Sequence, residues 1–173
     1  MSATGRRIWR FLCVGGLALW GLAGAGMARA EVLQAVVVHV TDGDTVWARP
    51  DAADAHARPL KLRLLGIDAP ERCQAWGTQA TAALAARVLN RHVRLDTRAH
   101  DDYGRVLASL SLDGEDIGGW MVRQGHAWSY HYRRSAGPYA AQEDEARRQA
   151  RGLFADAGAE EPRWFRRRHG ACD

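Results

Sequence analysis

Short apolar segments rich in β-branched residues alternate with turn-forming residues through most of this sequence, and this alternation limits what the chain can fold into. Five such segments are expected to be strands: residues 32–41, 45–49, 60–67, 92–96 and 105–112. Asp42-Gly43-Asp44 is a tight-turn sequence between the first two, and residues 101–104 form another between the last two. The pattern therefore predicts a domain built on a small β-barrel.

Three further segments are expected to be helices: residues 79–90, 116–125 and 138–152. The first is rich in alanine and carries Leu84 and Val88 four residues apart, on one face. Asp116 can cap the second, which stops at Gly125. The predicted class is α+β, with a five-stranded OB-type barrel and about three helices. The OB-fold is such a barrel and commonly binds oligonucleotides.

The first thirty residues have the three parts of a secretory signal peptide. Three arginines stand within the first ten residues, an apolar run covers residues 11–26, and small residues precede a cleavage point after Ala30. We therefore expect a secreted or periplasmic protein with no stable membrane association after cleavage. The alternative is an uncleaved membrane anchor, although the run is short compared with the about 20 apolar residues of a spanning helix.

Residues 31–173 are expected to form a single monomeric domain, with residues 156–173 as a tail. The full chain has 24 Lys and Arg against 20 Asp and Glu. Four of the arginines lie in the leader, which has no acids, so the remaining chain carries 20 cations and 20 anions. Any attraction to phosphate must therefore come from local clusters of charge rather than from net charge.

Several carboxylates follow strands that would be neighbours in such a barrel. Asp44 and Asp68 stand at strand ends, where two carboxylates and a backbone carbonyl would supply the hard oxygen ligands that Ca²⁺ prefers. Pro70 bends the chain after Asp68 and would bring Glu71 to the same place. Each of these segments taken alone is also typical of an ordinary turn.

Two arginines complete a reactive set. Arg63 lies inside an apolar strand, where an unpaired charge would be costly, so it either forms a structural salt bridge or serves a site. Arg63 and Arg105 present forked donors that match phosphate oxygens. A metal, a carboxylate base and two guanidinium groups are the parts that phosphodiester hydrolysis requires.

Four segments, in order, resemble those of the staphylococcal-nuclease-like thermonucleases: Thr41-Asp42-Gly43-Asp44-Thr45-Val46, Arg63-Leu64-Leu65-Gly66-Ile67-Asp68-Ala69-Pro70-Glu71, Asp102-Tyr103-Gly104-Arg105 and Val122-Arg123-Gln124-Gly125. The resemblance extends over residues 36–154. It implies a secreted, calcium-dependent nuclease that cleaves DNA and RNA with little sequence preference.

The resemblance also implies a role for each matching residue. The calcium ligands would be Asp44, Asp68 and the backbone carbonyl of Ala69, with Asp42 as an acid beside the metal. Glu71 would orient or deprotonate the attacking water, while Arg63 and Arg105 would hold the phosphate. The residues expected to line the nucleotide site are Tyr103, Tyr130 and Tyr132.

Two other functions fit parts of the sequence. A non-catalytic OB module could bind nucleic acid, but Glu71 and both arginines are present, which favours an enzyme. An extracellular domain that uses calcium only for folding would leave Arg63 and Arg105 without a role.

Two cysteines remain after the leader, and export would place them in an oxidising compartment. We predict a disulfide between Cys73 and Cys172, which would hold the basic residues 166–168 beside the active site; the alternative is two free thiols. The run 163–168 mixes arginines with aromatic residues, so it is interpreted either as a contact for nucleic acid or as a solvated tail.

Overall fold

The computed structural model describes residues 31–52, 54, 56–170 and 172. The predicted signal peptide, residues 1–30, lies outside the described residues. Within the described part of the chain, no helix has the length and apolar character needed to cross a membrane.

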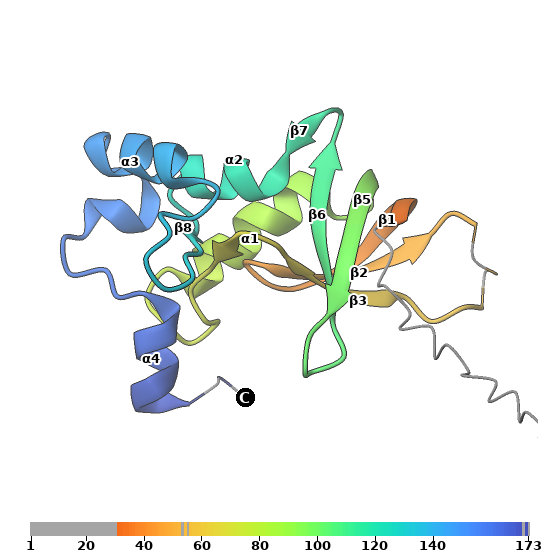
Figure 1. Ribbon diagram of the computed structural model, residues 1–173, viewed down its shortest axis with the longest axis horizontal. Helices are drawn as coiled ribbons and strands as arrows, with labels where there is room; N and C mark the ends of the chain where they lie inside the picture. The colour runs from red at the N-terminus through yellow and green to blue at the C-terminus, as the bar shows by residue number, and fades with distance from the viewer. Residues whose placement is uncertain (1–30, 53, 55, 171, 173) are drawn as a thin grey trace, which may run out of the picture.

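A closed β-barrel forms the centre of the fold (Figure 1). Its strands are β1 (Glu31–Asp42), β2 (Thr45–Pro50), β3 (Leu60–Leu64), β5 (His92–His100) and β6 (Val106–Leu112). Antiparallel pairing gives the order β3-β2-β1-β5-β6, and a parallel pairing of β3 with β6 closes the barrel. Closure leaves no free edge between these strands. The predicted α+β class with a five-stranded OB-type barrel is confirmed.

Alternation along the strands fills the barrel. On β6 the buried residues are Val106, Ala108, Leu110 and Leu112, while the residues between them are half-exposed. This period of two places one face of the strand inside the barrel. Helix α1 (Gly77–Val88) packs against β1 and buries Leu84 and Val88, as the sequence predicted.

One predicted strand is broken in two. Residues 60–67 form β3 and then the two-residue strand β4 (Ile67–Asp68), because Gly66 adopts a left-handed conformation (φ 77°) between them. Strand β4 pairs with β8 (Trp128–Ser129), and β7 (Glu115–Asp116) pairs with β6. The break places Asp68 in β4, outside the five barrel strands.

The described residues contain four α-helices rather than about three. Asp116 caps α2 (Ile117–Arg123) by accepting a hydrogen bond from the Gly119 amide, as predicted. The segment expected as one helix over 138–152 forms α3 (Ala140–Arg148) and a 3-10 turn, Gly152–Ala155. Ala150 and Gly152 have positive φ angles, which end the helix early.

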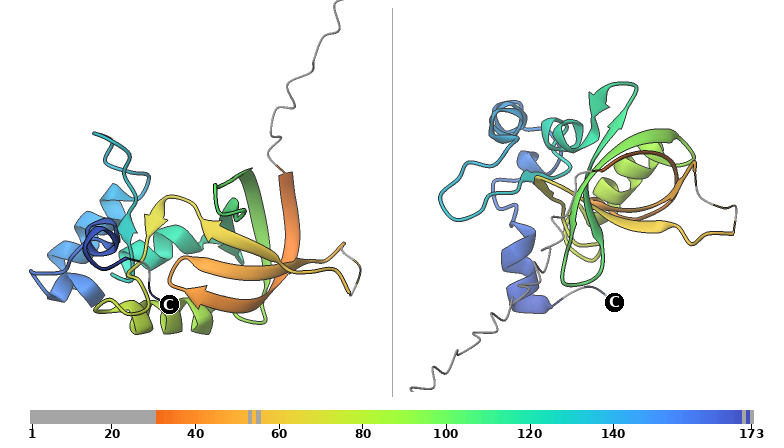
Figure 2. Two further views of the ribbon diagram at one scale, coloured as in Figure 1. Left: turned by 90° about the horizontal axis from the view of Figure 1, so that it is seen from below. Right: turned by 45° about the vertical axis from the view of Figure 1, so that its right-hand side comes forward.

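Within the segment predicted as a tail, residues 162–169 form helix α4 (Pro162–His169). Pro162 stands in its first turn, where the missing amide hydrogen costs no hydrogen bond. Helices α3 and α4 lie to one side of the barrel (Figures 1 and 2). The loop that precedes α1 is attached to this region, because the Gln74 side chain donates to the Glu160 carbonyl at 2.5 Å.

Candidate active site

The predicted catalytic residues meet in a cavity of about 480 Å³ at one end of the barrel. Its lining is mostly charged, and consists of Asp42, Asp44, Lys61, Arg63, Ala69, Pro70, Glu71, Tyr103, Arg105 and Arg166. These residues come from the β1–β2 turn, β3, the loop after β4, the β5–β6 turn and α4. Elements far apart in the sequence therefore build one site.

The two predicted metal carboxylates are buried side by side. Asp44 and Asp68 are only 6% and 5% exposed. Asp44 Oδ2 accepts a hydrogen bond from the Ala69 amide at 2.9 Å, which ties the β1–β2 turn to the residue after Asp68. A Cβ atom on Gly43 would lie 2.7 Å from the Ala69 Cβ, so this close approach requires glycine.

Arg63 connects these two acids. Its guanidinium forms an ion pair with Asp44 and donates from Nη2 to Asp68 Oδ1 at 2.9 Å. Only 14% of the Arg63 side chain is exposed, so the pairing offsets the cost of burying its charge. The salt bridge that the sequence left open as an alternative for Arg63 is therefore present, and its partners are the two carboxylates predicted as metal ligands.

Burial perturbs the acids of this cavity. Desolvation, together with the negative charge of Asp44, raises the pKa of Asp42 to about 7. Burial also raises the pKa of Asp68, although the positive charges of Arg63 and Arg166 oppose the rise. Crowded, desolvated carboxylates of this kind are stabilised in their charged form by a cation.

A metal ion would depend on few protein ligands here. In the described ranges, no group of three or more His, Cys, Asp or Glu side chains is arranged to hold one. Of the predicted ligands, Asp44 and Asp68 would supply two carboxylates, and the adjoining Ala69 would supply a backbone carbonyl. An all-oxygen set of this kind fits a hard cation that completes its coordination with water and substrate oxygens.

Glu71 lies at the start of a tight loop. Its amide donates to the Gln74 side chain at 3.1 Å, and its carbonyl accepts from the Gln74 amide at 2.9 Å. A Cβ atom on Gly77 would fall 1.9 Å from the Glu71 carbonyl oxygen, so the loop can close only over glycine. The carboxylate faces the cavity, where Oε1 accepts from Arg166 Nη1 at 2.7 Å.

Arg166 was not among the predicted site residues. It reaches Asp68 as well as Glu71, with Nη2 at 3.2 Å from Asp68 Oδ2. Burial disfavours its charge, but the hydrogen bond to Glu71 and the charge of Asp68 raise its pKa above the ordinary value. The sequence signal for the position of Arg166 was the predicted Cys73–Cys172 disulfide, because that bond would hold residues 166–168 beside the site.

Asp101 is a second residue that the sequence did not single out. Its carboxylate accepts from Arg105 Nε at 2.7 Å and from the amides of Tyr103 and Arg105 at 3.0 and 2.9 Å. Desolvation raises the pKa of Asp101, but these hydrogen bonds outweigh it and leave the pKa below its ordinary value. Asp101 thus fixes both the turn and the direction of Arg105. The sequence signal for this pairing was that Asp101 stands four residues before Arg105.

The three predicted substrate tyrosines do not lie together. Tyr103 lines the cavity, is 85% exposed and has the Arg105 guanidinium 5.5 Å from its ring centre. Tyr130 and Tyr132 are also exposed but do not line it, and Tyr130 lines a smaller pocket beside Asp68. Only Tyr103 is therefore in the reactive cavity.

Cys73 and Cys172 form a disulfide with their Cα atoms 5.8 Å apart, across 99 residues of sequence. The bond joins the loop that carries Glu71 to the segment after α4. The expectation of a disulfide here agrees with the structure.

Comparison with known proteins gives consistent matches. The model of the family described as staphylococcal nuclease homologue matches residues 61–156. Protein ParB of Escherichia coli is 39% identical over 161 residues, which cover 87% of this chain and 88% of that protein. A micrococcal nuclease of Shigella flexneri is 38% identical over 144 residues, covering 76% and 79%. An uncharacterized endonuclease of Haemophilus influenzae is 34% identical over 131 residues, covering 76% and 71%.

The barrel, the charged cavity and these matches define a phosphodiester-hydrolysing nuclease, whose substrates are nucleic acids. The chain belongs to the family of staphylococcal nuclease homologues, and the predicted resemblance is confirmed.

Proposed function

We propose that this nuclease is exported, requires Ca²⁺, and cleaves both DNA and RNA with little sequence preference. One observation carries the proposal: Asp44 and Asp68 are two buried carboxylates that share Arg63 and stand next to Glu71, and the Ala69 amide donates to Asp44. Calcium is favoured because all these ligands are hard oxygens.

The protein side chains have distinct roles in this proposal. Asp44, Asp68 and the Ala69 carbonyl hold the ion, which would polarise the phosphate and offset negative charge that develops on it. Glu71 orients and deprotonates the attacking water. Arg63 and Arg105 donate to the phosphate oxygens, and Asp101 keeps Arg105 in position for this.

Low sequence preference follows from what the cavity offers a substrate. Charged groups that bind phosphate contact a part of the substrate common to every nucleotide. The exposed ring of Tyr103 offers an aromatic face on which any base can stack. Both features are compatible with DNA and RNA. Tyr130 and Tyr132 would contact the strand only outside the reactive cavity.

Export is supported by the leader-like residues 1–30 and by the disulfide, which is stable in oxidising compartments. We propose that the released domain, residues 31–173, acts as a monomer with no stable membrane association.

The purified protein comprising residues 31–173 tests the reaction directly. Plasmid DNA and a structureless RNA should both be degraded in Ca²⁺, and degradation should stop when a calcium chelator is in excess. Asp68→Asn provides a matched control, because it removes one ligand charge but little volume. Undiminished cleavage in excess chelator would exclude the proposed metal dependence. Cleavage of only one nucleic acid would exclude the proposed breadth.

A further inference from the structure

Helix α4 places a third guanidinium among the acids of the site. Arg166 contacts both Glu71 and Asp68, at 2.7 and 3.2 Å, although it lies almost 100 residues away in the sequence. Its side chain is 38% exposed, whereas that of Asp68 is 7% exposed, so the arginine reaches into the site from outside.

We propose that Arg166 is an internal competitor of the metal ion. Through Nη2 it pairs with Asp68, a carboxylate that the ion needs. Through Nη1 it pairs with Glu71, the proposed base. Arg63 donates to Asp68 Oδ1 and leaves Oδ2 to Arg166, which lies 3.2 Å from it. Guanidinium and Ca²⁺ repel each other at such short distances, so Arg166 and the ion cannot share this oxygen without loss of affinity. This inference rests on the cation site in the proposed function.

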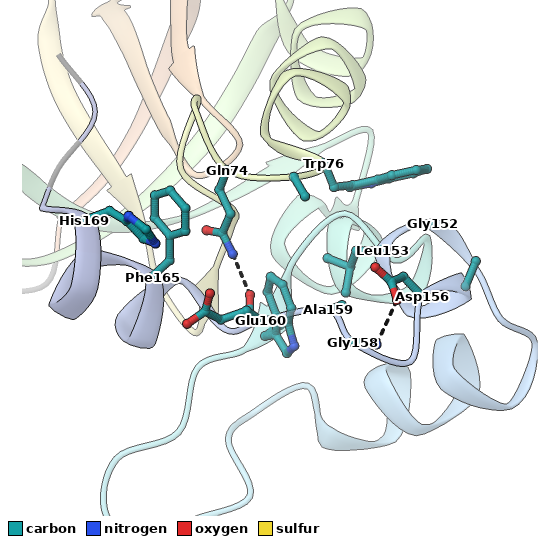
Figure 3. Close-up of a pocket in the computed structure, with 13 residues that line it drawn as sticks. Gln74, Trp76, Gly152, Leu153, Asp156, Gly158, Ala159, Glu160, Phe165 and His169 are labelled. Carbon is teal, nitrogen blue, oxygen red and sulfur yellow. Dashed lines mark hydrogen bonds between the residues drawn. The ribbon is translucent and has the colours of Figure 1, made fainter.

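The contacts of α4 suit a segment that can leave the site. Among its residues only Pro162 is buried, so little apolar packing fixes it in place. Phe165 and His169 line a second cavity, which separates them from Trp76 and Leu153 (Figure 3). A helix with open space beside it and mainly polar contacts is readily displaced.

A disulfide and a hydrogen bond keep this displacement local. The Cys73–Cys172 disulfide ties the segment after α4 to the loop of Glu71, and the hydrogen bond from Gln74 to the Glu160 carbonyl ties the segment before it (Figure 3). Both attachments lie within three residues of Glu71. Arg166 therefore stays at high effective concentration near the acids even when its ion pairs are broken.

The affinity for the metal ion would then depend on how often Arg166 occupies the acids. A ligand that binds only one of two states has its apparent affinity reduced by the fraction of molecules in that state. If Arg166 occupies the acids in about nine of ten molecules, its removal should tighten Ca²⁺ binding about tenfold. Loss of the disulfide should tighten binding as well, because the effective concentration of Arg166 falls.

Calorimetric titration of the protein with Ca²⁺, in the absence of nucleic acid, measures this directly. Arg166→Gln should bind Ca²⁺ about tenfold more tightly than the wild type. Arg167→Gln is the matched control, since it removes the same charge from the next residue, whose guanidinium lies 5.3 Å from the Trp164 ring centre. Its affinity should stay within about twofold of wild type, since Arg167 has no role in the proposal.

A second pair of variants tests the role of the Cys73–Cys172 disulfide, which tethers α4 to the loop of Glu71. Cys172→Ser should tighten Ca²⁺ binding in the wild-type background but have no effect in the Arg166→Gln background, since the tether acts through Arg166. Unchanged or weaker binding by Arg166→Gln overturns the inference, and so does equal tightening by Cys172→Ser in both backgrounds.

Failure of the underlying site gives a different result. If neither wild type nor Arg166→Gln binds Ca²⁺, or if Asp68→Asn binds it as tightly as wild type, the proposed metal site is wrong and the inference fails with it.

Discussion

Asp101→Asn isolates the orientation of Arg105 from the shape of the turn. The asparagine side chain can still accept from the Tyr103 and Arg105 amides through its oxygen, but its NH₂ group would face Arg105 Nε in place of the carboxylate oxygen at 2.7 Å. The turn should therefore persist while the arginine is released.

The size of the effect follows from the lost bond. A hydrogen bond between charged groups contributes about 1.5–3 kcal/mol. Because the two side chains are 23% and 17% exposed, solvent screening favours the lower end of that range. About 1.4 kcal/mol corresponds to a factor of ten in rate, so kcat should fall about tenfold.

The assay is steady-state cleavage of a labelled oligonucleotide at saturating Ca²⁺, with urea unfolding of each variant alongside. Asp113→Asn is a matched control: Asp113 pairs with Arg91 at 3.4 Å on an exposed turn, and asparagine tolerates its positive φ of 53°. A kcat for folded Asp101→Asn within twofold of wild type, or an equal loss in both variants, would refute the reasoning.

Three further changes test other parts of the molecule. Glu71→Gln should lower kcat by about 10²-fold or more while calorimetric Ca²⁺ affinity does not weaken, and near-normal kcat would exclude Glu71 as the base. Arg63→Gln should lower the melting temperature of the metal-free protein, because Asp44 and Asp68 lose their shared partner. For the same reason Ca²⁺ should raise the melting temperature of this variant more than that of the wild type, and an equal increase in both would contradict this. Burial lowers the pKa of His126 below 6.5, and Trp76 donates to its Nδ1, so the unfolded state binds more protons as pH falls below about 6.5. The stabilisation from neutral His126 is complete above that pH and should decrease as the pH falls below it. His126→Gln should therefore lose less urea-unfolding free energy than the wild type between pH 7.5 and 5.5.

The sequence predicted best where neighbouring residues determine the structure. An apolar segment after a turn sequence identified β6, and the capping aspartate identified α2, because both signals are local. Asp44, Arg63 and Asp68 were predicted together because strand ends in a small barrel converge on one edge. The break at Gly66 was missed, because apolar residues continue on both sides of it.

Helix α4 could not be predicted from periodicity. Three consecutive arginines and a histidine end it, and Pro162, Trp164 and Phe165 are too few apolar residues to show a helical period. Its position depends on a disulfide across 99 residues and on ion pairs with Asp68 and Glu71, which only the folded chain brings close. The position of Arg166 therefore depends on tertiary contacts that local sequence patterns do not reveal.

The parallel pairing of β3 with β6 makes completion of the active site depend on closure of the barrel. Leu62 pairs with Val106 and Arg63 with Leu107, so Arg63 and Arg105 become neighbours only when residues far apart in the chain meet. Contacts with such long sequence separation form slowly, because much of the chain must be ordered first. A folding intermediate that has only the β1–β2–β3 hairpins already contains Asp44 and Arg63, yet it lacks Arg105. Nuclease activity during refolding should therefore appear only with barrel closure.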